Sequence, residues 1–217
     1  LGLLVEQILR HVPELPRLRL SSVDGVEIDE RLFDILTGET RMMPHLHLSL
    51  QSGDNMILKR MKRRHSRELA VDLVQRLQAK RPDITIGADI IAGFPTETDD
   101  MFANSLALID DCNIVHGHVF PYSPKEGTPA AKMPQISRDV IKARAAELRK
   151  AAAAQKQAWL QSLIGSNQQV LTERPGDNGH AENFAHVALD KTIGDGNIVT
   201  ASITGVDGGK LTAAIKE

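Results

Sequence analysis

The residues best suited to chemistry gather between positions 44 and 66. Leucines alternate there with four polar residues, His45, His47, Ser49 and Gln51. This two-residue period is typical of a β-strand with one polar face. A polar turn ends the strand, and a helical segment with six cations and no acid follows between positions 55 and 67. Such a strand end beside a cationic helix suits an anionic ligand, although a half-buried strand followed by a solvated basic helix would show the same pattern.

Histidines also recur in a second stretch, so that two pairs share the same i, i+2 spacing: His45 with His47, and His116 with His118. Each pair lies on one face of its predicted strand. We expect no metal site here, because no carboxylate stands at a recognisable spacing from these histidines. Cys112 is the single cysteine of the chain, which excludes an intrachain disulfide and a multi-cysteine metal site.

The composition of the chain argues against two classes of partner, namely nucleic acid bound through bulk charge and a membrane. The formal net charge of −2 argues against binding nucleic acid through bulk charge, so any such binding needs a local patch. Hydrophobic residues at 41% and charged residues at 25% are ordinary for a globular protein. No apolar run reaches the length of a membrane span, so we expect no membrane partner.

The positions of these residues depend on a repeated strand–helix pattern. We predict strands at 18–23, 44–51, 85–93 and 114–122, with helices between them that begin after the capping residues Asp29, Ser66 and Thr98. Four such alternations predict a parallel sheet with right-handed crossovers. Because four units do not close an eight-unit barrel, the sheet is either a partial barrel or open.

The character of the sequence changes after position 166. Ser137 is predicted to cap a long helix that continues roughly to Leu163. Beyond it, short β-like runs at 169–172, 185–189, 197–203 and 210–215 are separated by turn residues, which predicts a small antiparallel barrel. We therefore divide the chain into the sheet domain 1–136, a connecting helix 137–166 and the barrel 167–217.

Several stretches together resemble one family, the methylthiotransferases, which are radical S-adenosylmethionine enzymes that modify tRNA or a ribosomal protein. The matching stretches are 18–22 (LRLSS), 44–53 (PHLHLSLQSG), 58–63 (LKRMKR), 89–97 (DIIAGFPTE), 120–124 (FPYSP) with 127–131 (GTPAA), and 182–184 (ENF). The HLHL and VFPYS forms are most similar to the branch that acts on threonylcarbamoyladenosine in tRNA. The resemblance implies an α/β fold: a partial (β/α) radical-enzyme barrel with about four units present, followed by a TRAM-like β-barrel.

The resemblance also implies S-adenosylmethionine and two 4Fe-4S clusters in the full-length protein, with tRNA as partner and a cytoplasmic location. The family holds its radical cluster with a Cys-x3-Cys-x2-Cys loop, which this sequence lacks. We expect the cluster sites to lie upstream of Leu1, and the chain alone to be inactive and to bind no cofactor. We expect a monomer, although an exposed sheet edge of a partial barrel can pair with a second copy.

By this resemblance, seven residues are candidates for S-adenosylmethionine binding: Ser22, Gln51, Ser52, Arg63, Gly93, Phe120 and Tyr122. Arg63 suits a carboxylate because its planar fork donates two parallel hydrogen bonds. Each has a structural alternative, namely a turn cap for Gln51 and Ser52, a surface cation for Arg63, and core packing for the aromatic residues. Glu97 we assign to a structural role at a helix N-terminus.

Candidates for RNA contact are Lys59, Arg60, Arg64, Asn183 and Phe184. Against RNA binding by the tail, residues 167–217 hold four cations and seven acids, a net charge of −3. Two alternatives to the tRNA enzyme therefore stay open. One is a methylthiotransferase acting on an aspartate of a ribosomal protein, and the other is a non-catalytic RNA-binding module.

Overall fold

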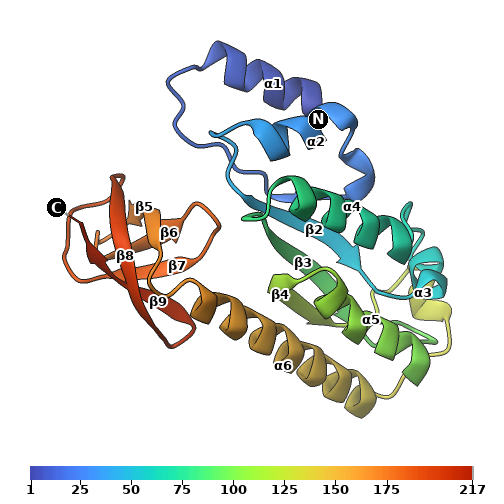
Figure 1. Cartoon of the computed structure of the whole chain (residues 1–217). Helices are drawn as coiled ribbons and strands as arrows, with labels where there is room; N and C mark the ends of the chain where they lie inside the picture. The colour runs from blue at the N-terminus through green and yellow to red at the C-terminus, as the bar shows by residue number, and fades with distance from the viewer. Residues whose placement is uncertain (217) are drawn as a thin grey trace.

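The computed structural model of the chain describes residues 1–216 and consists of a helix-covered sheet, a long helix and a small barrel (Figure 1). The elements before the long helix are α1 (Gly2–His11), β1 (Ser22–Val23), a 3₁₀ helix (Gly25–Glu27), α2 (Glu30–Gly38), β2 (His45–Gln51), α3 (Asn55–Arg60), α4 (Arg67–Lys80), β3 (Thr85–Ala92), α5 (Asp99–Asp111), β4 (Ile114–Pro121) and a second 3₁₀ helix (Ala130–Lys132). The long helix is α6 (Arg138–Ser162), and the barrel contains β5 (Asn167–Glu173), β6 (Asn178–Ala181), β7 (His186–Leu189), β8 (Ile198–Asp207) and β9 (Lys210–Ile215).

The sheet is parallel and has the strand order β1-β2-β3-β4. The predicted parallel sheet of a partial barrel is thereby confirmed. The first strand is shorter than predicted: only Ser22–Val23 pair with β2, while Leu18 makes an isolated parallel bridge to Met42. The carboxyl ends of all four strands point to one edge, which is where α/β folds place ligands.

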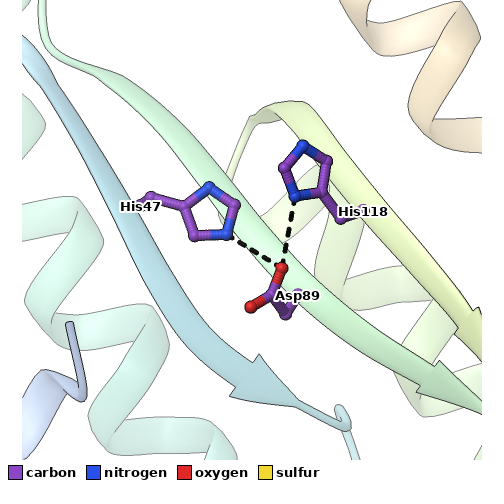
Figure 2. Close-up of side chains that lie close together, drawn as sticks. All are labelled: His47, Asp89 and His118. Carbon is purple, nitrogen blue, oxygen red and sulfur yellow. Dashed lines mark hydrogen bonds and ion pairs between the residues drawn. The ribbon is translucent and has the colours of Figure 1, made fainter. Parts of the chain in front are cut away.

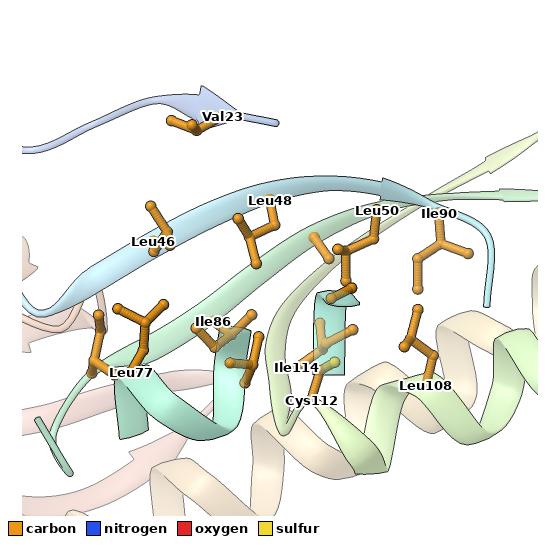
Figure 3. Packing of buried hydrophobic residues seen from close by; sticks show 14 of the residues in the cluster. Val23, Leu46, Leu48, Leu50, Leu77, Ile86, Ile90, Leu108, Cys112 and Ile114 are labelled. Atoms are coloured by element: carbon orange, nitrogen blue, oxygen red, sulfur yellow. The ribbon is translucent and has the colours of Figure 1, made fainter. Parts of the chain in front are cut away.

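Alternation along β2 separates an apolar face from a polar face. Leu46, Leu48 and Leu50 are at most 2% exposed, and they point toward the helices, where they meet Leu77 of α4 and Leu108 of α5 (Figure 3). His47, Ser49 and Gln51, which lie between the leucines, are only partly buried. A shift of the register by one residue would exchange the two faces, so leucine burial fixes the direction of the polar side chains.

The helix starts follow the predicted caps. The side chains of Asp29, Ser66, Thr98 and Ser137 each accept a hydrogen bond from a backbone N–H of the first turn, at 2.8, 3.2, 3.3 and 3.4 Å. The cationic segment differs from the expectation of one continuous helix, because α3 ends at Arg60 and Lys62 adopts a positive φ of 58°. This tight turn aims Arg63 back toward the sheet.

The barrel is closed by five strands in the order β5-β6-β7-β9-β8. Most pairs are antiparallel as predicted, but β7 and β9 pair in parallel. The sequence prediction also missed β6, which lies between the predicted runs 169–172 and 185–189. Gly179 is needed inside this strand, since a Cβ there would lie 2.0 Å from the carbonyl oxygen of Leu171.

Helix α6 runs alongside β4 and leads into the barrel (Figure 1). Ala152 belongs to the core beneath the sheet, whereas Leu160, two turns later, belongs to the core of the barrel. Among residues 1–216, none of the helices combines the length and the apolar character needed to cross a membrane.

Candidate functional site

The polar face of the sheet brings together three side chains from three neighbouring strands (Figure 2). His47 Nε2 lies 3.0 Å from Asp89 Oδ1, and His118 Nδ1 lies 3.3 Å from the same oxygen. The register explains this meeting, because His118 pairs with Asp89 across β3 and β4, and His47 pairs with Gly87 across β2 and β3. The sequence prediction missed Asp89, which stands inside a nearly continuous apolar run. The fold thus places a carboxylate, that of Asp89, beside two of the histidines for which the sequence spacing showed none.

A cavity of about 470 Å³ lies at the carboxyl ends of β2 and β3. Gln51, the last residue of β2, lines it with a positive φ of 67°, which turns the chain away from the sheet. The wall of the cavity combines cations, apolar side chains and a loop segment: Arg60, Met61, Lys62, Arg63, Ile91, Phe94, Thr128, Pro129 and Ala130. Its size is ordinary for a small-molecule site.

Arg63 is held at this cavity by two contacts on one nitrogen. Nη2 donates to Asp24 Oδ2 at 3.1 Å and to the carbonyl oxygen of Ser49 at 2.8 Å. Asp24, which the sequence analysis did not single out, also lies 3.4 Å from His65 Nδ1. Arg63 Nε is buried and has no hydrogen-bond partner among the described residues. The guanidinium is therefore fixed in position at the wall of the cavity, where its positive charge fits a ligand that carries a carboxylate, such as S-adenosylmethionine.

Three predicted cofactor residues, Ser22, Ser52 and Gly93, make close contacts within the chain, and their contact with a cofactor stays a prediction. Ser52 is only 2% exposed, and its hydroxyl meets Ser105 Oγ at 3.2 Å and accepts from the Asp54 N–H. Gly93 allows α6 to pack closely, because a Cβ there would lie 2.5 Å from Ile141 Cγ1. Ser22 Oγ bonds Ser49 Oγ at 2.8 Å and lines a different cavity, beside Asp89.

The two predicted aromatic residues do not line the cavity of Arg63. Phe120 pairs with Ile91 in the strand register and is 51% exposed. Tyr122 packs edge-on against Phe94 and lines a separate cavity of about 400 Å³ beside α6. Of the seven predicted residues, the structure therefore brings Gln51 and Arg63 to one cavity, and the other five lie elsewhere.

Glu97 forms a buried ion pair. Its Oε2 accepts from Arg144 Nη1 at 2.9 Å and from the Gly93 N–H at 3.0 Å, and its side chain is fully buried. Burial raises the pKa of Glu97 above its usual value, even though Arg144 acts in the opposite direction. These contacts agree with the structural role expected for this acid.

The predicted RNA-facing cations lie on one side of the cavity. Lys59 is exposed, and Arg60 lines the cavity and donates to the Thr96 carbonyl oxygen at 3.4 Å. Arg64, whose side chain is 64% exposed, pairs with Glu27. Pairing reduces the charge that Arg64 can offer to a phosphate, while Lys59 keeps its charge available. Their contact with RNA stays a prediction.

Asn183 and Phe184 lie where the barrel meets the sheet, and Phe184 is 37% exposed. Their contact with RNA stays a prediction. Asn183 is 8% exposed, and its carbonyl oxygen accepts from Thr85 Oγ1 at 2.8 Å. The ring of Phe184 lies 4.7 Å from that of His45 and 5.5 Å from that of His116. Burial lowers the pKa of His45 to about 2 and that of His116 to about 4, so both rings are neutral at pH 7.

The residues present do not fit an iron–sulfur cluster. Cys112 is the single cysteine, is fully buried in the sheet core, and has a thiol pKa raised to about 12 by burial. A protonated, inaccessible thiol cannot ligate iron.

Comparisons with known proteins agree with this geometry. A family model described as the radical SAM superfamily matches residues 4–109. The chain is 46% identical over 212 residues to a protein of Rickettsia prowazekii (strain Madrid E) named threonylcarbamoyladenosine tRNA methylthiotransferase MtaB, covering 98% of this chain and 50% of the relative. It is 35% identical over 214 residues to a tRNA-2-methylthio-N(6)-dimethylallyladenosine synthase of Agrobacterium fabrum, covering 95% and 47%. The chain thus spans about half the length of these curated relatives.

Among solved structures, coproporphyrinogen III oxidase from Escherichia coli, described as a radical SAM enzyme, matches with a TM-score of 0.54 at 16% identity, covering 94% of this chain and 51% of that one. At this identity the likeness concerns the fold alone, and it agrees with the partial barrel. The chain therefore belongs to the radical SAM superfamily and, within it, to the methylthiotransferases.

Proposed function

We propose that the protein containing this chain is a tRNA methylthiotransferase that adds a methylthio group to C2 of threonylcarbamoyladenosine beside the anticodon. The relative with 46% identity carries this substrate in its name. The structural observation that supports the proposal most is the cavity at the carboxyl ends of β2 and β3, where Arg63 is anchored by Asp24 beside Gln51.

In this proposal the cavity holds S-adenosylmethionine. Arg63 would bind the carboxylate through its guanidinium, the Gln51 amide would bind a polar group, and Ile91 and Phe94 would supply apolar walls. When bound together with a reduced cluster, this cofactor supplies radical chemistry. Since Cys112 is buried, the ligands for both proposed 4Fe-4S clusters have to come from outside this chain, and the chain alone is proposed to be inactive.

Lys59 and Arg60 on α3 are the proposed contacts to tRNA phosphates, because they lie beside the cavity where the substrate base would enter. Substituting an exposed phosphate-binding lysine is expected to weaken tRNA binding and to lower its salt dependence. Filter binding of tRNA to the full-length protein with Lys59→Gln would measure both quantities.

The decisive experiment expresses the complete reading frame in a bacterium that lacks its own methylthiotransferase for this base. Mass spectrometry of digested tRNA then quantifies methylthiolated threonylcarbamoyladenosine. Wild type is expected to restore it, and Arg63→Gln to reduce it at least tenfold, because a carboxylate loses its charged partner. Arg31→Gln is the matched control, since Arg31 sits in an exposed ion pair with Glu6. A wild type that restores nothing, or an Arg63→Gln variant as active as the control, would contradict the proposal.

The acidic character of residues 167–217, with a net charge of −3, favours one second candidate, a methylthiotransferase for a ribosomal-protein aspartate. The same cultures distinguish the two candidates. A ribosomal protein heavier by one methylthio group, together with unchanged tRNA, would support the second candidate and exclude the first.

A further inference from the structure

The cluster of His47, Asp89 and His118 has the composition of a metal site (Figure 2). The two ring nitrogens and one carboxylate oxygen lie within 4.8 Å of one another, and the three side chains come from β2, β3 and β4. Three parallel strands of one sheet form a rigid base, so the ligand atoms are arranged before any ion arrives. These three residues have no role in the methylthiotransferase function proposed above.

Gly87 leaves the space that the His47 ring occupies. A Cβ at position 87 would lie 2.5 Å from His47 Nδ1, which is closer than van der Waals contact allows. Because glycine leaves this space empty, the imidazole lies across β3 and presents Nε2 to Asp89 at 3.0 Å. The rings of His47 and His118 approach to 4.9 Å between centroids, which brings both histidines over the same carboxylate.

The spacing of the three ligand atoms is close to that around a tetrahedral divalent ion, and in the absence of an ion His47 Nε2 and Asp89 Oδ1 form a hydrogen bond. Both ring nitrogens approach the same oxygen, Oδ1, at 3.0 and 3.3 Å. Ligands bound to Zn²⁺ at about 2.0–2.2 Å are separated from each other by roughly 3.3 Å. Small side-chain rotations would therefore bring all three atoms to bonding distance.

The surroundings leave room for a fourth ligand. The cluster lines a cavity of about 440 Å³, together with Arg19 and Ser22. His118 is exposed over 62% of its side chain, while His47 is exposed over 12%, so an ion can enter from the cavity and remain partly enclosed. Arg19 lines the same cavity and brings a positive charge to it, which suits an anion at the open position.

We propose that His47 Nε2, Asp89 Oδ1 and His118 Nδ1 form a binding site for one divalent transition-metal ion of the Zn²⁺ type, with a fourth coordination position open to the cavity. Two imidazoles and one carboxylate are the protein ligands of several catalytic zinc sites, and three protein ligands with an open position are typical of catalytic rather than structural zinc. The site does not depend on the proposed activity, since none of its ligands lines the cavity of Arg63.

The test uses the 217-residue chain, freed of metal by a chelator and titrated with Zn²⁺ by calorimetry and with Co²⁺ by visible absorption. We expect one ion per chain and the intense visible bands of four-coordinate Co²⁺. Asp89→Asn and His118→Gln are expected to weaken binding at least tenfold. His11→Gln is the matched control, because His11 is an exposed histidine on α1 that forms a hydrogen bond with Gln7.

A fourth variant tests the geometry rather than the ligands. Gly87→Ala keeps all three ligands but displaces the His47 ring, so it is expected to weaken binding as well. Circular dichroism and thermal unfolding establish that each variant is folded, and the large exposure of His118 makes His118→Gln the safest of them. Absence of binding by the wild type, or equal affinity of His118→Gln and His11→Gln, would overturn the proposal.

Discussion

The hydroxyl of Thr85 donates a hydrogen bond to the carbonyl oxygen of Asn183 at 2.8 Å, which joins the first residue of β3 to the turn after β6. Thr85 is only 6% exposed, so water cannot readily replace this contact. Around it, Phe184 of the barrel packs against His45 and His116 of the sheet. The two parts of the chain are thus connected by a buried polar contact surrounded by rings.

Replacing Thr85 by valine should lower the free energy of unfolding by about 1–3 kcal/mol, because the Asn183 carbonyl oxygen would stay buried without its donor. Urea unfolding followed by the fluorescence of Trp159, the single tryptophan, reports on this region, since Trp159 packs 5.1 Å from His116. Thr204→Val is the control, because its hydrogen bond to Thr212 is exposed. Equal losses for the two variants would contradict the role given to Thr85.

The junction should be sensitive to acid. Burial lowers the pKa of His116 to about 4 and that of His45 to about 2, whereas an unfolded histidine titrates near 6.5. Below pH ~6.5 the unfolded chain binds more protons than the folded chain, so stability is complete above that pH and falls as the pH decreases toward 4. Each histidine contributes a loss of about 1.4 kcal/mol per pH unit inside this window.

Unfolding free energies at pH 7.5, 6.0 and 5.0 would measure this dependence. His116→Phe removes one histidine with a lowered pKa and should make the dependence shallower by about 1.4 kcal/mol per pH unit between pH ~6.5 and 5. His11→Gln, at an exposed histidine, should leave the slope unchanged. A slope in His116→Phe that equals the wild-type slope would show that the acid sensitivity arises elsewhere.

Gly93 and Gly127 allow the energetic cost of a left-handed backbone to be distinguished from the cost of a steric clash. Both have positive φ, of 76° and 82°, so alanine at either position pays about 1–2 kcal/mol for a left-handed backbone. A Cβ at Gly93 additionally meets Ile141 at 2.5 Å, whereas nothing lies within 4 Å of one at Gly127. Gly93→Ala should therefore lose about 1–3 kcal/mol more in urea unfolding than Gly127→Ala. Similar losses would mean that α6 moves away at no cost.

Removing Arg144 should destabilise the protein by about 3–5 kcal/mol, because the Glu97 carboxylate would stay buried without its partner. The loss in Arg144→Leu should be smaller at pH 5 than at pH 7, since Glu97 can then take up a proton, consistent with its raised pKa. Arg149→Leu on the same helix is the control, because the hydrogen bond that Arg149 donates to the Val119 carbonyl oxygen is exposed. Chemical denaturation of both variants at the two pH values gives the comparison.

Sequence periodicity predicted the sheet because the alternation of buried leucines and polar residues can be recognised within a single strand. Helix starts were predicted for a similar reason, since a cap such as Ser66 bonds three residues ahead. Contacts between distant segments could not be predicted in this way. Nothing local shows that Gly93 faces Ile141, or that the Ser52 hydroxyl meets Ser105.

In the candidate site, too, local patterns were predicted from the sequence and contacts between distant segments were not. Arg63 was predicted from its motif, but its anchor Asp24 lies 39 residues away in sequence and is revealed only by the fold. Asp89 was hidden in an apolar run and meets His47 and His118 only through strand register. Asn183 and Phe184 pack on the sheet, because the tail folds back onto a surface that the sequence pattern does not show.

The length of helix α6 sets the distance and the rotation between the sheet and the barrel. Ala152 and Leu160 bind different cores from one continuous helix, about 12 Å apart along its axis. One extra residue between them would rotate the barrel by about 100° around that axis, which would carry Phe184 away from His45. Inserting whole turns would restore the direction but not the distance. The number of residues in this helix, more than their identity, therefore sets which surfaces of the barrel and the sheet meet.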